Sequence, residues 1–212
     1  MARPRKQETR SLNPSIFIFC EGSKTEPNYF RALIKFLNFP GELAKVEVID
    51  SEKTNLVGLV DEAKALRDKN KYSTDGDQYW IVVDKDGYTQ HSTGFDTAAA
   101  NSFKVAFSSI CFEFWFFCHF EFSTAQKAKC AVLIKEQLSK CIPDYEKGQK
   151  DIFSLLNSRL HEACKNAKRI RKHWLDVGDG KPIFELNPYT NVDQLVEKLI
   201  SYRKEIGGNP KS

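Results

Sequence analysis

The sequence lacks any hydrophobic run long enough to cross a membrane. A membrane-spanning helix needs about 20 consecutive apolar residues, whereas the longest candidate, residues 110–122, is shorter and carries Glu113, His119 and Glu121. The apolar segment after the basic amino terminus is also short and leads directly into Glu21, so we expect no secretory signal. We therefore expect a cytoplasmic protein without a membrane partner.

Paired cysteines with metal-site spacing are missing as well. The sequence contains no C-x-x-C pair, and His161 with Cys164 supplies at most half of a zinc site. The six cysteines are scattered through apolar or helical segments: Cys20, Cys111, Cys118, Cys130, Cys141 and Cys164. We expect them to be buried thiols of a reducing compartment.

The chain has little excess charge and neither internal repeats nor low-complexity tracts. A net charge of +4 is too small to identify a nucleic-acid partner. Basic residues nevertheless cluster before residue 11 and again over 165–173, where Lys168, Arg169 and Arg171 lie. Such clusters neutralise phosphates, although a solvated helix face would show the same pattern.

Strand-like and helix-like patterns alternate through the first half of the chain. Strands are expected at 15–20, 45–50, 78–83 and 103–108, with intervening helices at about 25–39, 54–71 and 94–101, the second capped by Thr54. This β-α-β-α-β order predicts an α/β fold with a parallel sheet and right-handed crossovers.

The second half is expected to be mainly helical. The aromatic block 111–122 does not distinguish helix from strand by its periodicity. Helices are expected over 124–140 and 151–173, and a capping box at 190–193 opens a last helix to about residue 205. We divide the chain into a flexible basic arm (1–14), an α/β domain (15–122) and a helical carboxyl-terminal region (123–212).

Two apolar runs end at carboxylates. Residues 16–20 lead into Glu21 and Gly22, and residues 80–83 lead into Asp84 and Asp86. Parallel strands bring their carboxyl ends to one edge of a sheet, where ligands bind, so Glu21, Asp84 and Asp86 should converge. Carboxylates that lie together favour a hard cation, Mg²⁺ or Mn²⁺. The alternative interpretation is that these residues are ordinary acids at strand ends that face water and bind no metal.

Other D-x-D motifs fit less well. An EF-hand loop needs glycine at its sixth position, which here is Thr89. Haloacid-dehalogenase-type phosphatases carry their D-x-D on the first strand, followed by Thr or Val, and receiver domains have no tandem pair on the third strand.

Several segments resemble a known family. The order of strand-Glu-Gly and strand-D-x-D-G resembles the Toprim domain of topoisomerases, primases and some nucleases. More narrowly, the chain resembles the RloB family through FCEGSKTEPNYF at 19–30, CFEFW at 111–115 with His119 and Phe120, Tyr145 and Lys147, and NPYTNV at 187–192 with Leu195 and Val196.

This resemblance implies a Toprim-like fold and Mg²⁺-dependent cleavage of nucleic acid. Glu21 matches the Toprim glutamate, and Asp84 and Asp86 match its metal-binding pair. Similar proteins are encoded beside type I restriction systems, which implies a role in defence against phage. One departure concerns Ser109-Ile110, which stands where the family has Asn-Pro, so the turn there is expected to differ.

Other residues join the candidate site by position or by resemblance. Glu113 lies in an apolar block, so it is either a catalytic or ligating acid or a salt-bridged structural one. Gly22 and Lys24 lie near a helix start, where phosphate contacts are natural. For His119 and for the group around Tyr145 and Lys147, the structural interpretation is favoured.

Together, these patterns and the resemblance predict an Mg²⁺-dependent nuclease. Asp84, Asp86 and Glu21 would hold the metal, Glu21 and Glu113 would be catalytic, and Gly22, Lys24, Lys168, Arg169 and Arg171 would bind DNA or RNA. Two alternatives stay open: a phosphohydrolase of nucleotides or small phosphates, and a non-catalytic module that docks a defence-operon protein. The sequence does not indicate an oligomeric state.

Overall fold

A five-stranded, mostly parallel sheet forms the centre of the molecule. The computed structural model describes residues 13–40, 44–70, 74, 76–85 and 90–207. The strands are β1 (Ile16–Cys20), β2 (Val46–Asp50), β3 (Gln78–Asp84), β4 (Lys104–Ser109) and β5 (Tyr189–Thr190), in the order β2-β1-β3-β4-β5. The first four pair in parallel and β5 runs antiparallel to β4. This architecture confirms the expected α/β class.

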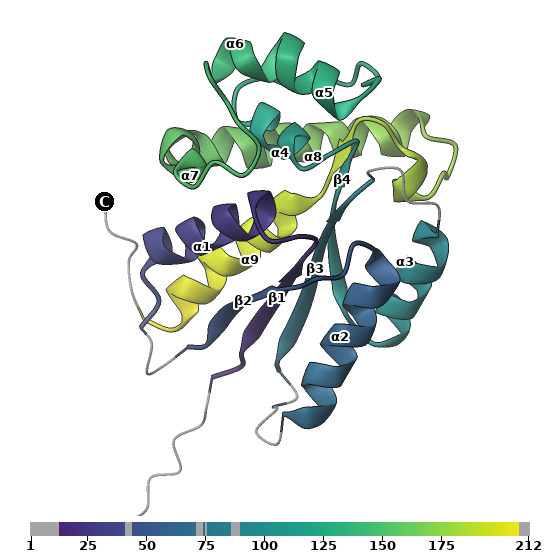
Figure 1. Cartoon of the computed structure of the whole chain (residues 1–212). Helices are drawn as coiled ribbons and strands as arrows, with labels where there is room; N and C mark the ends of the chain where they lie inside the picture. Colours follow the sequence, from purple (N-terminus) through teal and green to yellow (C-terminus); the bar gives the residue numbers. More distant parts are fainter. Residues whose placement is uncertain (1–12, 41–43, 71–73, 75, 86–89, 208–212) are drawn as a thin grey trace, which may run out of the picture.

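Helices cover both faces of the sheet, as Figure 1 shows. Helices α1 (Thr25–Leu37) and α9 (Val192–Glu205) lie on one face, and α2 (Leu56–Lys69) and α3 (His91–Ala100) on the other. Strand β1 is therefore buried on both sides: Ile16, Ile18 and Cys20 join the core under α1 and α9, while Phe17 and Phe19 join the core under α2. A strand that is covered on both faces needs apolar side chains at every position, which explains the unbroken hydrophobic sequence of β1.

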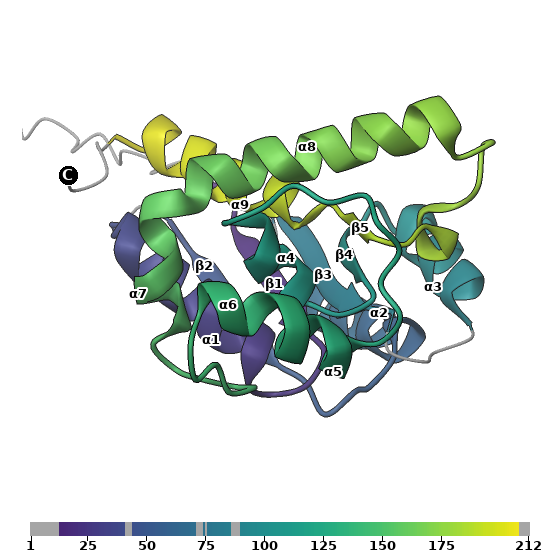
Figure 2. The ribbon, with the colours of Figure 1, turned by 90° about the horizontal axis from the view of Figure 1, so that it is seen from above.

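The remaining helical segments gather beyond the carboxyl edge of the sheet (Figures 1 and 2). They are shorter and more broken than the sequence suggests, because the expected helix over 124–140 begins only at residue 130 and contains a π-helical turn. The segments are α4 (Glu113–Cys118), α5 (Cys130–Leu133), η1 (Ile134–Leu138), α6 (Ser139–Cys141), α7 (Ile152–Leu156), η2 (Asn157–Arg159), α8 (Leu160–Val177) and η3 (Ile183–Glu185).

The carboxyl-terminal segment is built into the sheet. Asn191 follows β5, and its side chain accepts a hydrogen bond from the Phe107 amide (2.6 Å) and donates one to the Val105 carbonyl (3.0 Å). Helix α9 begins there, but without the expected capping box. The side chain of Asp193 is fully buried and instead forms a bidentate ion pair with Arg171 on α8.

Two further details concern turns. The side chain of Asn55, rather than Thr54, caps α2 by accepting a hydrogen bond from the Gly58 amide (2.8 Å). The Ser109–Ile110 peptide bond, in the turn that follows β4, is cis. Within the described part of the chain, no helix combines the length and the apolar composition that crossing a bilayer requires.

Candidate active site

Acidic side chains collect where β1 and β3 end. The Glu21 amide donates to the Val82 carbonyl (3.1 Å), which places Glu21 level with the last residues of β3. Asp84 is the final residue of β3, and one of its carboxylate oxygens accepts a hydrogen bond from the Phe112 amide (3.2 Å). Strands β1 and β3 are direct neighbours, so Glu21 and Asp84 lie at one edge, as the sequence predicts. Asp86 lies outside the described residues.

Glu26 is a further acid that the sequence reasoning missed. It lies in the first turn of α1 and is only 9% exposed. Its pKa rises to about 8, chiefly because burial disfavours the charged form, and further because of the charges of Asp84, Glu113 and Glu21. Three other carboxyl groups therefore lie within electrostatic reach of Glu26. The sequence offered one signal, because Glu26 follows Glu21 by five residues within segment 19–30.

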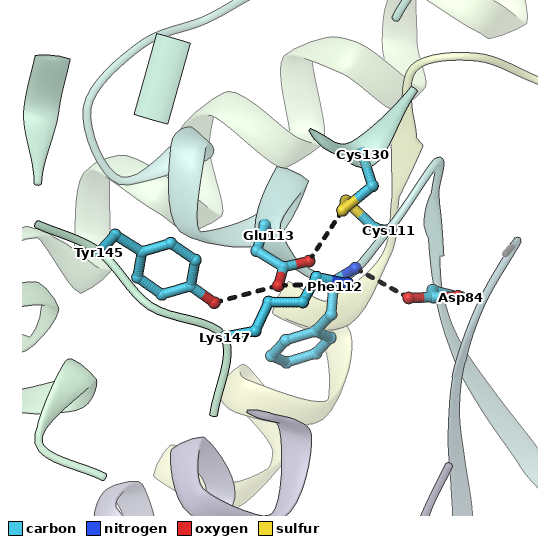
Figure 3. Close-up of a disulfide and its surroundings, with 7 residues drawn as sticks. All are labelled: Asp84, Cys111, Phe112, Glu113, Cys130, Tyr145 and Lys147. Carbon is cyan, nitrogen blue, oxygen red and sulfur yellow. Dashed lines mark hydrogen bonds and ion pairs between the residues drawn. A yellow bond between two sulfur atoms is a disulfide. The ribbon is translucent and has the colours of Figure 1, made fainter. Parts of the chain in front are cut away.

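Glu113 is the first residue of α4 and directly follows Phe112, whose amide binds Asp84 (Figure 3). Its carboxylate is 1% exposed and is held by groups distant in sequence. Tyr145 donates its hydroxyl hydrogen to Oε1 (3.0 Å), and the Lys147 ammonium lies 3.8 Å from the same oxygen. Tyr145 and Lys147 therefore contact Glu113 directly, and these contacts agree with the structural role that the sequence slightly favoured for them.

The other oxygen of Glu113 faces sulfur. Its Oε2 lies 3.4 Å from the Cys130 Sγ, and Cys130 is joined to Cys111 as a disulfide in the structure (Figure 3). The expectation that all six cysteines are buried free thiols is therefore wrong for this pair, because the turn after β4 and the start of α5 bring two distant cysteines together. Cys20, Cys118 and Cys164 are buried and free, and Cys141 is half-buried.

Removing the Tyr145 hydroxyl should measurably destabilise the protein. Tyr145→Phe deletes the hydrogen bond to the buried Glu113 carboxylate, so we expect a loss of about 1–3 kcal/mol in the free energy of unfolding, measured by urea denaturation. Tyr79→Phe is the matched control, because the Tyr79 hydroxyl is buried and has no hydrogen-bond partner among the described residues. Equal losses in the two variants would contradict this role for Tyr145.

Gly22 and Lys24 lie beside this cluster, in the turn between β1 and α1. Gly22 adopts a positive φ of 69°, a conformation that favours glycine. Lys24 is exposed, and its aliphatic stem packs against Gly148, whose carbonyl accepts a hydrogen bond from the Asn28 side chain (2.9 Å). The segment that carries Tyr145 and Lys147 is thereby docked on the start of α1.

The basic cluster on α8 divides into two kinds of residue. The Arg171 side chain is only 17% exposed. It forms an ion pair with the buried Asp193 and donates a hydrogen bond to the Thr190 carbonyl (3.1 Å), so it is not placed to bind a substrate. Lys168 and Arg169 are exposed: Lys168 pairs with Glu197, and the Arg169 guanidinium lies 3.9 Å from the centre of the Phe122 ring. These two remain candidates for contacts with a nucleic-acid backbone.

His119 lies in the core rather than in the acidic cluster. It is fully buried, and its Nδ1 lies 3.0 Å from the Trp115 carbonyl oxygen. Burial lowers the pKa of His119 to about 4, so the imidazole is neutral at physiological pH. Its environment matches the structural role that the sequence favoured.

A cavity of ≈ 530 Å³ opens beside the acids. Lys85, Lys129 and Cys130 line it, together with Ile110, Ala128, Ala131 and Asn187. Lys85 directly follows Asp84, and Cys130 lies beside Glu113, so the lining of the cavity adjoins two of the acids in the chain. This combination of acidic and basic groups suits a phosphate-containing ligand.

The carboxylates supply the hard oxygen donors that Mg²⁺ requires. The residues fit such an ion because three acids, Asp84, Glu113 and Glu21, lie within electrostatic reach of the buried Glu26. Among the described residues, however, the group of three ligand atoms that lies closest together is a different one, formed by Cys111, Glu113 and Cys130.

Comparison with known proteins identifies the family. The family model described as RloB-like protein matches residues 16–199. A search of curated proteins and a search of solved structures each found no match. The matched segment includes the acidic edge of the sheet and ends within helix α9. The chain therefore belongs to the RloB family.

Proposed function

We propose that the protein is a Toprim-type, Mg²⁺-dependent nuclease that hydrolyses phosphodiester bonds in DNA or RNA. The observation that carries this proposal is the convergence of Glu21, Glu26 and Asp84 at the carboxyl edge of β1 and β3, with Glu113 beside them. Strand-end carboxylates at this position in an α/β fold are suited to binding a metal and a phosphorylated ligand.

The proposed roles of the acids are metal binding and proton transfer. Asp84 and Glu21 would hold the ion, together with Asp86, which lies outside the described residues. A bound Mg²⁺ would polarise a phosphoryl oxygen and offset charge that develops on the phosphate. In the metal-free protein Glu26 holds a proton on its carboxyl group at neutral pH, because its pKa is about 8. Glu21 would accept or donate the proton during hydrolysis, as in the Toprim domains it resembles.

Basic groups would position the polyanion. Lys85 and Lys129 line the cavity beside the acids, and Lys24 is exposed at the turn after Gly22. Lysine contacts to phosphates set the register of a nucleic acid without reading its sequence. Lys168 and Arg169 on α8 would extend this basic surface. A cytoplasmic role in defence against phage, with or without a partner protein, belongs to the same proposal and rests on the family resemblance.

The test is a cleavage assay with the full-length chain. Single-stranded DNA, double-stranded DNA, RNA and tRNA are each incubated with Mg²⁺, with Mn²⁺ or with a chelator. We expect metal-dependent cleavage of at least one polymer and none with the chelator. Cleavage that persists in chelator, or the absence of cleavage under all of these conditions, would contradict the proposal.

A second candidate is a phosphohydrolase of nucleotides. The cavity of ≈ 530 Å³ falls within the range of small-molecule sites. This activity would release inorganic phosphate from mononucleotides and leave the polymers intact, so adding mononucleotides to the same assay separates the two functions.

A further inference from the structure

A compact group of three metal-binding side chains lies beside the acidic edge. One sulfur from Cys111, one from Cys130 and one carboxylate oxygen from Glu113 all lie within 4.8 Å of one another. Cys111 and Glu113 are each 1% exposed, and Cys130 is half-buried. No other group of three histidine, cysteine or acidic side chains in the described part of the chain meets this criterion.

The donor set is chemically different from the carboxylates at the strand ends. Two thiolates and one carboxylate select a thiophilic ion such as Zn²⁺, whereas Mg²⁺ prefers oxygen ligands alone. Three protein ligands also leave a fourth position for water or substrate, which is the pattern of catalytic rather than structural zinc sites.

The surroundings hold Glu113 in place for such a role. Its Oε1 is fixed by the Tyr145 hydroxyl (3.0 Å) and by Lys147 (3.8 Å), which leaves Oε2 directed at the sulfur of Cys130 (3.4 Å; Figure 3). A ligating carboxylate is commonly oriented by such outer hydrogen bonds. Cys130 also lines the cavity of ≈ 530 Å³, which provides a route for an ion.

We propose that Cys111, Cys130 and Glu113 form a binding site for Zn²⁺ or a similar thiophilic divalent ion in the reduced protein. The disulfide and the metal-bound state exclude each other because they use the same sulfur atoms. A dithiol reductant supplies two electrons, two protons convert the disulfide into two thiols, and the reductant becomes a disulfide. Binding of the ion then releases those two thiol protons. The proposal stands independently of the nuclease function.

The test is a metal titration of the reduced full-length protein under anaerobic conditions. Co²⁺ is the probe, because thiolate coordination gives it characteristic charge-transfer absorption, and Zn²⁺ is then added to displace it. We expect one ion per chain. Cys130→Ser should weaken binding by more than the roughly 10–100-fold that is lost when an outer-shell partner is removed. Cys141→Ser is the control, because Cys141 is a free, half-buried cysteine on the neighbouring α6.

Three outcomes would overturn the proposal. They are the absence of stoichiometric binding by the reduced wild type, equal affinity in Cys130→Ser, and undiminished binding after a thiol oxidant has closed the disulfide. None of these measurements depends on cleavage activity, so failure of the nuclease proposal leaves this test intact.

Discussion

Asp84→Asn should abolish metal-dependent cleavage and leave the fold intact. The substitution removes the negative charge at the end of β3 but keeps an amide oxygen that can accept the hydrogen bond from the Phe112 amide. Loss of a metal-binding carboxylate removes several kcal/mol of transition-state stabilisation, so we expect a fall in kcat/KM of more than about 100-fold. The measurement is the initial cleavage rate on the polymer that the wild type cuts best.

Asp96→Asn is the matched control for that experiment. Asp96 is an exposed acid on α3, and its substitution makes the same chemical change away from the carboxyl edge. We expect wild-type cleavage from this variant and the same thermal unfolding midpoint from both variants. A folded Asp84→Asn protein that cleaves at the wild-type rate would remove Asp84 from the site.

Glu26→Gln should stabilise the metal-free protein at alkaline pH. The folded pKa of Glu26 is about 8, against an ordinary value of 4.5. Below pH 4.5 both the folded and the unfolded states are protonated at this group. Between pH 4.5 and 8 the folded state retains a proton that the unfolded state loses, so wild-type stability falls as pH rises, and above pH 8 the penalty is complete.

The expected difference is large. A shift of this size corresponds to on the order of 3–5 kcal/mol, so the Gln variant should resemble the wild type near pH 4.5 and exceed it by that amount at pH 8.5. Urea denaturation at both pH values, in the presence of a chelator, measures the effect. Exposed Glu52→Gln serves as the control and should show no comparable gain.

Magnesium supplies an independent check on the same variant. A divalent ion among the carboxylates would favour their charged forms, so added Mg²⁺ should stabilise the wild type more than Glu26→Gln at pH 8.5. A pH-independent difference between the two proteins would show that Glu26 is not buried among other acids as the structure indicates.

The sequence by itself determined the α/β framework. Apolar runs such as residues 16–20 and 80–83 are buried and can be recognised without knowledge of distant contacts. The β-α-β connections leave few alternatives for strand order. The same reasoning placed Glu21 and Asp84 at one edge, because the end of a parallel strand fixes where the next residue lies. The motifs that resemble the RloB family are also short segments, so they too can be recognised without the tertiary structure.

Only the tertiary structure decided which distant residues complete the site. Cys130, Tyr145 and Lys147 reach Glu113 across 17 to 34 positions, through irregular segments whose path no periodicity encodes. The electrostatic character of Glu26 likewise depends on burial against three other acids. Arg171 shows the converse: its sequence neighbours suggest a solvated basic face, whereas its partner Asp193 lies on another helix. Local patterns specify elements, but the energies of buried charges depend on contacts that form only when those elements pack.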